Sequence, residues 1–163
     1  MPIRMFELFH GGVIVKLLRS DRPITLRMIE TRPAESWSTY TLNDAVDLFI
    51  TYSKAPRPYS RSGGGTSWTF PFSDKQLQQI NKIHDRDVYI ALVCAKSNLK
   101  NSDVPVCLLK PEEIEKIVDV SEAHQSITVR LPRGRGQFRI LKERKEEFLV
   151  PKLRLEKWDV PGS

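Results

Sequence analysis

Two strand-like runs separated by only two residues constrain the fold of this chain most strongly. Residues 37–42 and 45–52 are rich in β-branched and aromatic residues, and Asn43 and Asp44 stand between them. Asn and Asp tolerate the positive φ angles that a two-residue turn between antiparallel strands requires. The sequence therefore predicts a tight β-hairpin, and with it a sheet that contains antiparallel strands.

Hydrophobic periodicity predicts further strands on both sides of this hairpin. Residues 88–94 form a nearly continuous apolar run, which is typical of a central, buried strand. Residues 24–29 alternate between apolar and polar side chains after Pro23, which indicates a half-buried strand. The remaining predicted strands are residues 68–72, 104–109, 126–131, 137–141 and 148–150.

Residues 3–20 predict the first helix, although two adjacent glycines interrupt it. A glycine inside a helix costs about 1 kcal/mol relative to alanine, so Gly11 and Gly12 weaken this prediction. A helix followed by a strand that begins at Val13 is the alternative.

Two shorter helices have clearer start signals. Ser73 or Asp74 is expected to cap a helix that runs to about His84, with apolar residues at helical spacing. Pro111 begins a helix over residues 111–118, because proline suits the first turn and the acidic residues after it complement the helix dipole. Strands interspersed with two or three helices indicate an α+β fold with a mixed, mainly antiparallel sheet. A length of 163 residues is typical of one domain, so residues 1–163 are predicted to form a single globular unit.

The two cysteines, Cys94 and Cys107, both stand in apolar runs. A disulfide framework would need more cysteines, and a zinc site would need ligands at short spacing. We therefore predict two reduced thiols buried in strands of one sheet, which indicates a reducing, cytoplasmic setting. No run reaches the roughly 18 apolar residues that a membrane-spanning helix needs, so no membrane association is expected.

Residues 54–67 are predicted to form a long flexible loop, because prolines and three consecutive glycines interrupt any apolar periodicity. Basic residues with an aromatic residue among them lie on this loop, namely Lys54, Arg57, Tyr59 and Arg61. Arginine binds phosphate through a planar fork of donors, and an aromatic ring can stack on an unpaired base. The loop is therefore a candidate nucleic-acid-binding segment, and the binding of a protein partner there is the alternative.

A second basic group lies near the end of the chain. Arg133 and Arg135 stand in a glycine-flanked turn between two predicted strands, and Arg139 lies on the second of these strands. The net charge of +6 agrees with an anionic partner. We therefore predict a non-catalytic protein that binds DNA or RNA through these arginines and the loop, without a cofactor. The sequence leaves the oligomeric state open.

Several other kinds of site lack their sequence signals. The triple glycine at 63–65 is not followed by the Lys-Ser/Thr pair of a phosphate-binding loop. His10, His84 and His124 are scattered, with no cysteine or second histidine at the spacing of metal ligands. No serine stands in the glycine-flanked turn that exposes a nucleophile.

In the order of its predicted elements, the segment 1–95 resembles the core of the restriction-endonuclease-like superfamily. Both have a helix, a strand, a tight hairpin, a second helix and a further strand. In that family an acidic residue lies on the first helix, an aspartate lies near the start of the hairpin, and a Glu-x-Lys motif lies on the next strand. These groups hold Mg²⁺, which polarises the phosphate and activates water.

The resemblance implies which residues would take these places. Glu7 matches the acid of the first helix. Either Asp44 or Asp47 matches the aspartate, and Lys54 matches the lysine. Tyr52 stands where the second acid should be, so the motif is incomplete. The resemblance thus implies a nuclease-like fold that has lost or relocated its metal site, and a metal-dependent nuclease is the alternative function.

Overall fold

The predicted hairpin is present in the computed structural model, which describes residues 2–19, 21–32, 37–82, 86–96, 104–119, 125–142 and 146–162. Strands β2 (Trp37–Leu42) and β3 (Val46–Ser53) pair antiparallel in the register Leu42↔Val46. Asn43 and Asp44 have φ angles of 52° and 50°, as expected for a tight turn. The Ala45 N–H donates to the Leu42 carbonyl at 2.9 Å, so Ala45 belongs to the turn, and three residues instead of two separate the strands. The predicted tight hairpin is confirmed, with a turn that is one residue longer than predicted.

This hairpin belongs to a five-stranded sheet, sheet A, with the order β1-β2-β3-β6-β7. Its other strands are β1 (Leu26–Arg32), β6 (Asp87–Cys94) and β7 (Val106–Leu109). Strand β6 pairs parallel with β3, and the remaining neighbours are antiparallel. The apolar run at 88–94 is therefore an interior strand, as predicted.

The remaining strands form a second sheet, sheet B, where the sequence predicted a single sheet. Its order is β10-β9-β8-β5-β4, and all neighbours are antiparallel. The strands are β4 (Arg57–Tyr59), β5 (Gly65–Phe72), β8 (Gln125–Pro132), β9 (Gln137–Lys142) and β10 (Glu146–Pro151). The α+β class with mainly antiparallel pairing is confirmed. The number of sheets differs from the prediction for a physical reason. The alternation of apolar and polar side chains shows which face of a strand is buried, but it does not show which other strand it pairs with.

The segment 54–67 contains regular structure where the sequence predicted an irregular loop. After β4 comes a 3-10 turn, Arg61–Gly63, and β5 begins at Gly65. The prolines and glycines of this segment led to the prediction of a loop. Proline is nevertheless tolerated on an edge strand, and β4 is too short to show any apolar periodicity. The flexibility of the segment stays a prediction.

Three α-helices complete the fold. Helix α1 (Met5–Leu18) is continuous through its two glycines, so the alternative of a strand beginning at Val13 is wrong. Helix α2 (Asp74–Lys82) begins after Ser73, whose hydroxyl accepts a hydrogen bond of 3.3 Å from the backbone N–H of Gln76. Helix α3 is Pro111–Ile117. No helix in the described ranges is long and apolar enough to cross a membrane.

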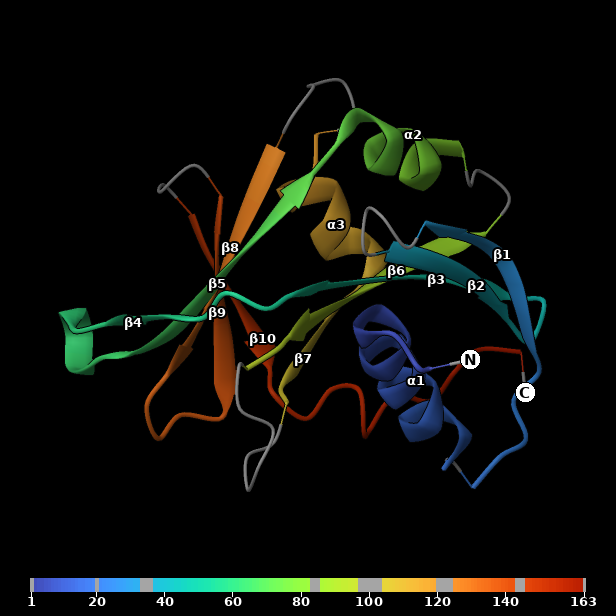
Figure 1. Cartoon of the computed structure of the whole chain (residues 1–163), viewed down its shortest axis with the longest axis horizontal. Coiled ribbons are helices and arrows are strands. Elements are labelled where there is room, and N and C mark those ends of the chain that lie inside the picture. Colours follow the sequence, from blue (N-terminus) through green and yellow to red (C-terminus); the bar gives the residue numbers. More distant parts are fainter. Residues whose placement is uncertain are drawn as a thin grey trace.

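The elements form layers around sheet A (Figure 1). One face of sheet A packs against α1, with Phe9, Val13 and Leu17 in the contact. The opposite face packs against sheet B, α2 and α3, and the aromatic centre of that core is the stack of Trp37, Phe49 and Phe72. The resemblance to the restriction-endonuclease-like superfamily rests on the element order α1, β1, β2–β3, α2, β6. The chain has this order, with β4 and β5 inserted between β3 and α2. Membership of that superfamily stays a prediction.

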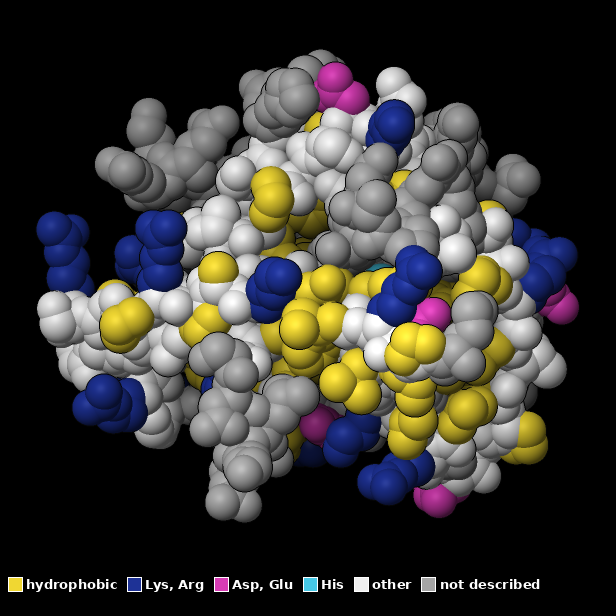
Figure 2. Space-filling view, viewed as in Figure 1, with side chains coloured by type: hydrophobic (Ala, Val, Ile, Leu, Met, Phe, Trp, Pro, Cys, Tyr) yellow, Lys and Arg dark blue, Asp and Glu magenta, His cyan; other side chains and the backbone are white. Residues whose placement is uncertain are grey.

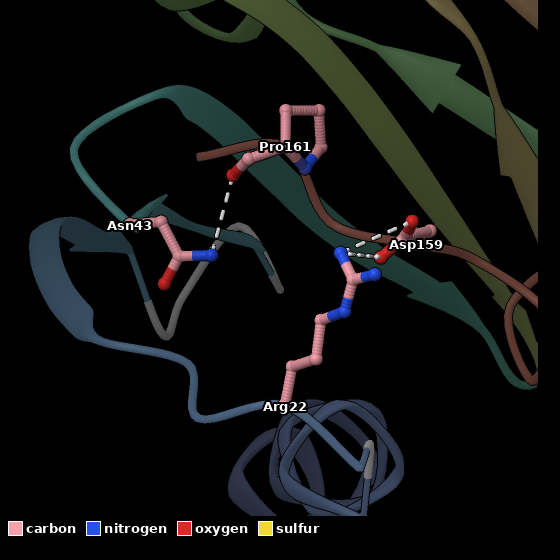
Figure 3. A network of polar contacts seen from close by, with 4 residues as sticks. All are labelled: Arg22, Asn43, Asp159 and Pro161. Carbon is pink, nitrogen blue, oxygen red and sulfur yellow. Dashed lines mark hydrogen bonds and ion pairs between the residues drawn. The ribbon is translucent and has the colours of Figure 1, made fainter. Parts of the chain in front are cut away.

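After β10 the chain returns along the α1 side of sheet A. Leu155 and Val160 are buried there, and the ring of Trp158 lies 4.6 Å from that of Tyr89. Figure 3 shows how the end of this segment is held: Arg22 pairs with Asp159 at 3.3 Å, and the Asn43 side chain donates to the Pro161 carbonyl at 3.2 Å. The segment therefore ties the β2–β3 turn to the chain that follows α1.

Both cysteines are free and buried, and they lie on the adjacent strands β6 and β7, as predicted. Burial raises the pKa of the Cys94 thiol well above its ordinary value, and burial raises the pKa of Cys107 likewise. Both thiols therefore stay neutral in the folded protein at neutral pH.

A pH dependence of stability follows. In the unfolded chain a thiol ionises near its ordinary pKa of 9.0, whereas the folded protein keeps the proton. The unfolded state then binds fewer protons than the folded state, so the free energy of unfolding falls as pH rises above about 9. For two thiols we expect a loss of about 3 kcal/mol between neutral pH and about pH 10, measured by urea unfolding. The variant Cys94→Ala/Cys107→Ala should lose this part of the dependence. Equal slopes for both proteins would contradict the prediction.

Candidate nucleic-acid interface

The structure brings the two predicted basic segments together at one end of sheet B. The β8–β9 turn lies beside the β4–β5 hairpin, because Gly65 pairs with Pro132 and the Arg133 N–H donates to the Gly64 carbonyl at 3.0 Å. We call this region the basic end; it comprises the exposed Arg57, Arg61, Arg133 and Arg135 and the half-buried Arg130 and Arg139. Figure 2 shows basic side chains around the end of the molecule where β4 projects.

A row of arginines crosses the outer face of sheet B. The strand registers align Arg57 with Ser67, Ser67 with Arg130, and Arg130 with Arg139. The alternate residues of β5, including Trp68, point into the core, so this row lies on the opposite face. Neighbouring strands are about 4.8 Å apart, so the row presents guanidinium groups over about 14 Å.

Arg130 and Tyr59 form the best-defined contact of this region. The guanidinium carbon of Arg130 lies 5.1 Å from the centre of the Tyr59 ring, within the range of a cation–π interaction. Tyr59 was predicted to stack on a base. The half-buried ring holds the Arg130 guanidinium on one face, and the stacking of a base on Tyr59 stays a prediction.

Gly65 allows this arrangement. A Cβ atom at this position would lie 2.4 Å from the Leu131 carbonyl oxygen and 2.8 Å from the Tyr59 hydroxyl. Both distances are far below van der Waals contact, so only glycine lets β5 approach β8 so closely under the Tyr59 ring.

Four of the six arginines of the basic end are exposed at the surface. Within the described part of the chain, its four exposed arginines form no ion pair. Arg130 and Arg139 stand directly opposite each other on β8 and β9. Lys54, the other predicted basic residue, is exposed three residues before β4, where the chain passes from sheet A to sheet B.

The residues implied by the nuclease resemblance do not come together. Glu7 is exposed on α1 and accepts a hydrogen bond of 2.9 Å from the Arg4 N–H. Asp44 lies in the turn before β3, whereas Lys54 follows the last residue of that eight-residue strand, so they are more than about 20 Å apart. Asp47 is buried on β3 and accepts a hydrogen bond of 2.7 Å from the Thr41 hydroxyl. This geometry lends the nuclease alternative no support.

Among the residues that the structure describes, no three His, Cys, Asp or Glu side chains are grouped as metal ligands. His10 is buried on the side of α1 that faces sheet A, with Nδ1 2.7 Å from the Ser38 hydroxyl. His84 and His124 lie outside the described residues.

Sequence reasoning left Arg130 out of the predicted site. The signal was available, since residues 127–131 alternate between apolar side chains and Thr128 and Arg130, which places Arg130 on the outer face. Its contact with Tyr59 depends on the pairing of β5 with β8, and no local sequence pattern predicts that pairing.

The chain was compared with protein-family models, with curated proteins and with solved structures, and none of them matches it.

Proposed function

We propose that this protein binds nucleic acid through the basic end of sheet B and performs no chemistry on it. The observation that carries the proposal is the meeting of two basic segments, distant in the chain, in one projecting cluster of arginines. Arginine is the residue best suited to phosphate, and the backbone of a glycine-flanked turn can approach an anion closely. A cytoplasmic setting, supported by the two buried thiols, is part of the same proposal.

Contacts to phosphate release condensed counterions, so the affinity should fall as salt rises. On duplex DNA the slope of log affinity against log salt is about −0.9 for each phosphate neutralised. Replacing Arg133 and Arg135 by alanine removes two exposed charges at the β8–β9 turn. We expect the slope to flatten by roughly two units and the affinity to fall similarly for all sequences. Stability should change by less than about 0.5 kcal/mol, because both side chains are exposed.

The measurement is fluorescence anisotropy of labelled duplex and single-stranded DNA and RNA over a salt series. The matched control is Arg19→Ala/Arg27→Ala. It removes one exposed arginine at the end of α1 and one exposed arginine on β1. The control should keep the wild-type slope. No binding by the wild type at low salt would overturn the proposal, and equal slopes for all three proteins would place the binding charge outside the basic end.

A further inference from the structure

The helices leave the outer face of sheet B uncovered. Trp68 and Phe70 of β5 point into the core between the sheets, where α2 and α3 also pack, and α1 lies beyond sheet A. No helix in the described part of the chain therefore lies on the opposite face of sheet B (Figure 1). Tyr59 belongs to this outer face, because it stands opposite Gly65, on the same side of the sheet as Ser67. The face thus offers an aromatic ring among arginines to a ligand from outside.

Gly65 makes room for the Tyr59 ring on this face. The Tyr59 hydroxyl lies only 2.8 Å from the position that a Cβ atom of Gly65 would take. The ring therefore extends over the bare backbone of β5 toward β8, where it meets Arg130. Tyr59 is half-buried, so part of its ring still faces the solvent. The strand supports the ring, and the guanidinium of Arg130 lies over it.

Arg130 lies over this ring without an acceptor for one of its protons. Its Nε atom is buried and has no hydrogen-bond partner among the described residues. Within the same ranges Arg130 also forms no ion pair. A buried donor without an acceptor is unfavourable, because it has given up its hydrogen bonds to water. An anion that offers acceptors nearby therefore competes well with the contact between Arg130 and Tyr59.

A phosphate group beside the ring would offer such acceptors. Arg57 and Arg130 stand on either side of Ser67 in the row of arginines, two strand spacings or about 10 Å apart. Both side chains are long, so both can reach a phosphate that lies over Ser67. Ser67 is two residues, or about 7 Å, along β5 from Gly65, beneath the Tyr59 ring. One nucleotide can therefore place its base at the ring and its phosphate between the two arginines.

We propose that the basic end takes a single strand, one unpaired base of which replaces the Arg130 guanidinium on the Tyr59 ring. Arg130 then turns to the phosphate of the same nucleotide. Stacking on an aromatic ring is favourable for every base, and the guanidinium gains charge-assisted hydrogen bonds to the phosphate. This inference rests on the proposed function and adds the form of nucleic acid that the site prefers.

A duplex cannot make this exchange. Its bases are paired and stacked on one another, so that only their edges are open in grooves of about 6–12 Å width. Tyr59 lies half-buried against β5 instead of standing out from the protein, so its ring cannot reach those edges. A duplex can therefore contact only the arginines, through its phosphates. The arginines contribute to the affinity for both forms, whereas Tyr59 contributes only to the affinity for a single strand.

Fluorescence anisotropy with a labelled single strand of DNA, and with the duplex that it forms with its complement, tests this difference. The wild type is expected to bind the single strand more tightly than the duplex. Tyr59→Leu should weaken single-strand binding about tenfold and leave duplex binding unchanged, because it removes the stacking surface alone. The matched control is Tyr59→Phe, which keeps the ring and should bind both forms like the wild type. RNA of the same sequence shows whether the sugar matters.

A fluorescent base tests the exchange itself. We expect 2-aminopurine in the middle of the strand to lose fluorescence when the wild type binds, because the base stacks on Tyr59. Tyr59→Leu should abolish this quenching. Arg130→Ala leaves the ring in place without its guanidinium, so the quenching should persist. The slope of log affinity against log salt should flatten by about 0.7 in the same variant, since one phosphate contact is lost on a single strand.

The outcomes separate this inference from the proposed function. No binding of either form by the wild type at low salt overturns both. Equal losses for single strand and duplex in Tyr59→Leu mean that the ring only positions Arg130; they overturn the inference and leave the proposed function in place. Unquenched 2-aminopurine in the complex with the wild type has the same meaning, and this measurement needs no variant. Circular dichroism establishes that each variant is folded at the temperature of measurement.

Discussion

Replacing Gly65 by valine is expected to lower the melting temperature by about 6–12 °C. The new side chain would have to occupy space that the Leu131 carbonyl, the Pro132 Cα and the Tyr59 hydroxyl already fill, at 2.4, 2.9 and 2.8 Å from its Cβ. Two of these three atoms belong to the backbone of β8, so the β5–β8 pairing must open at this end. Overpacking of this kind costs about 3 kcal/mol, which corresponds to about 2–4 °C per kcal/mol in a chain of this size.

The matched control is Gly136→Ala. A Cβ at Gly136 would meet no atom within 4 Å, so its melting temperature should stay close to that of the wild type. Because Gly65→Val also displaces Tyr59 from Arg130, the variant should bind nucleic acid more weakly even at temperatures where it is folded. Calorimetry and anisotropy measure the two effects. A Gly65→Val protein as stable as Gly136→Ala would show that β8 is not as close as the structure places it.

Replacing Trp68 by alanine is expected to cost about 3–5 kcal/mol. Trp68 lies on β5 with only 1% of its surface exposed, and its indole N–H donates to the Ala95 carbonyl at 2.8 Å. The side chain therefore joins sheet B to the end of β6 in sheet A. Its removal leaves a large cavity between the sheets and a buried carbonyl without its donor. Urea unfolding measures the loss.

Trp158→Ala is the comparison for this variant. Trp158 is half-buried and packs on Tyr89 at the surface of sheet A. Its loss removes contacts without opening the core, so it should cost less than half as much. An equal or larger cost for Trp158→Ala would mean that the segment after β10, and not the contact between sheets, dominates stability.

Local sequence patterns predict most of the elements of this fold. The Asn43-Asp44 turn, the apolar run of β6 and Pro111 at the start of α3 each carry their own signal within a few residues. The division into two sheets depends instead on which strands pair across long stretches of chain. The pairing of Phe72 with Gln125 is of this kind, and no local pattern contains it.

The candidate site, too, was predicted only in those parts that have a local sequence signal. Arg133 and Arg135 were predicted at a glycine-flanked turn, and the structure exposes them there. That this turn lies against Gly64, beside Arg57 and Tyr59, follows from the β4–β5 and β5–β8 registers together. The regular structure of the β4–β5 hairpin was missed because a three-residue edge strand with a proline has almost no propensity signal.

On the ribosome, β5 emerges directly after its short partner β4 but long before β8, the strand that pairs with its whole length. Sheet A can assemble once β7 has been made, but β5 has to wait for residues 125–132 before β8 covers its edge. Until then Trp68, Phe70 and Phe72 lack the apolar side chains of β8 and β9 that bury them in the finished protein. A strand with an open edge and exposed aromatic residues readily joins the same strand of another nascent chain. Chains halted between β7 and β8 should therefore be the form of this protein that depends most on chaperones.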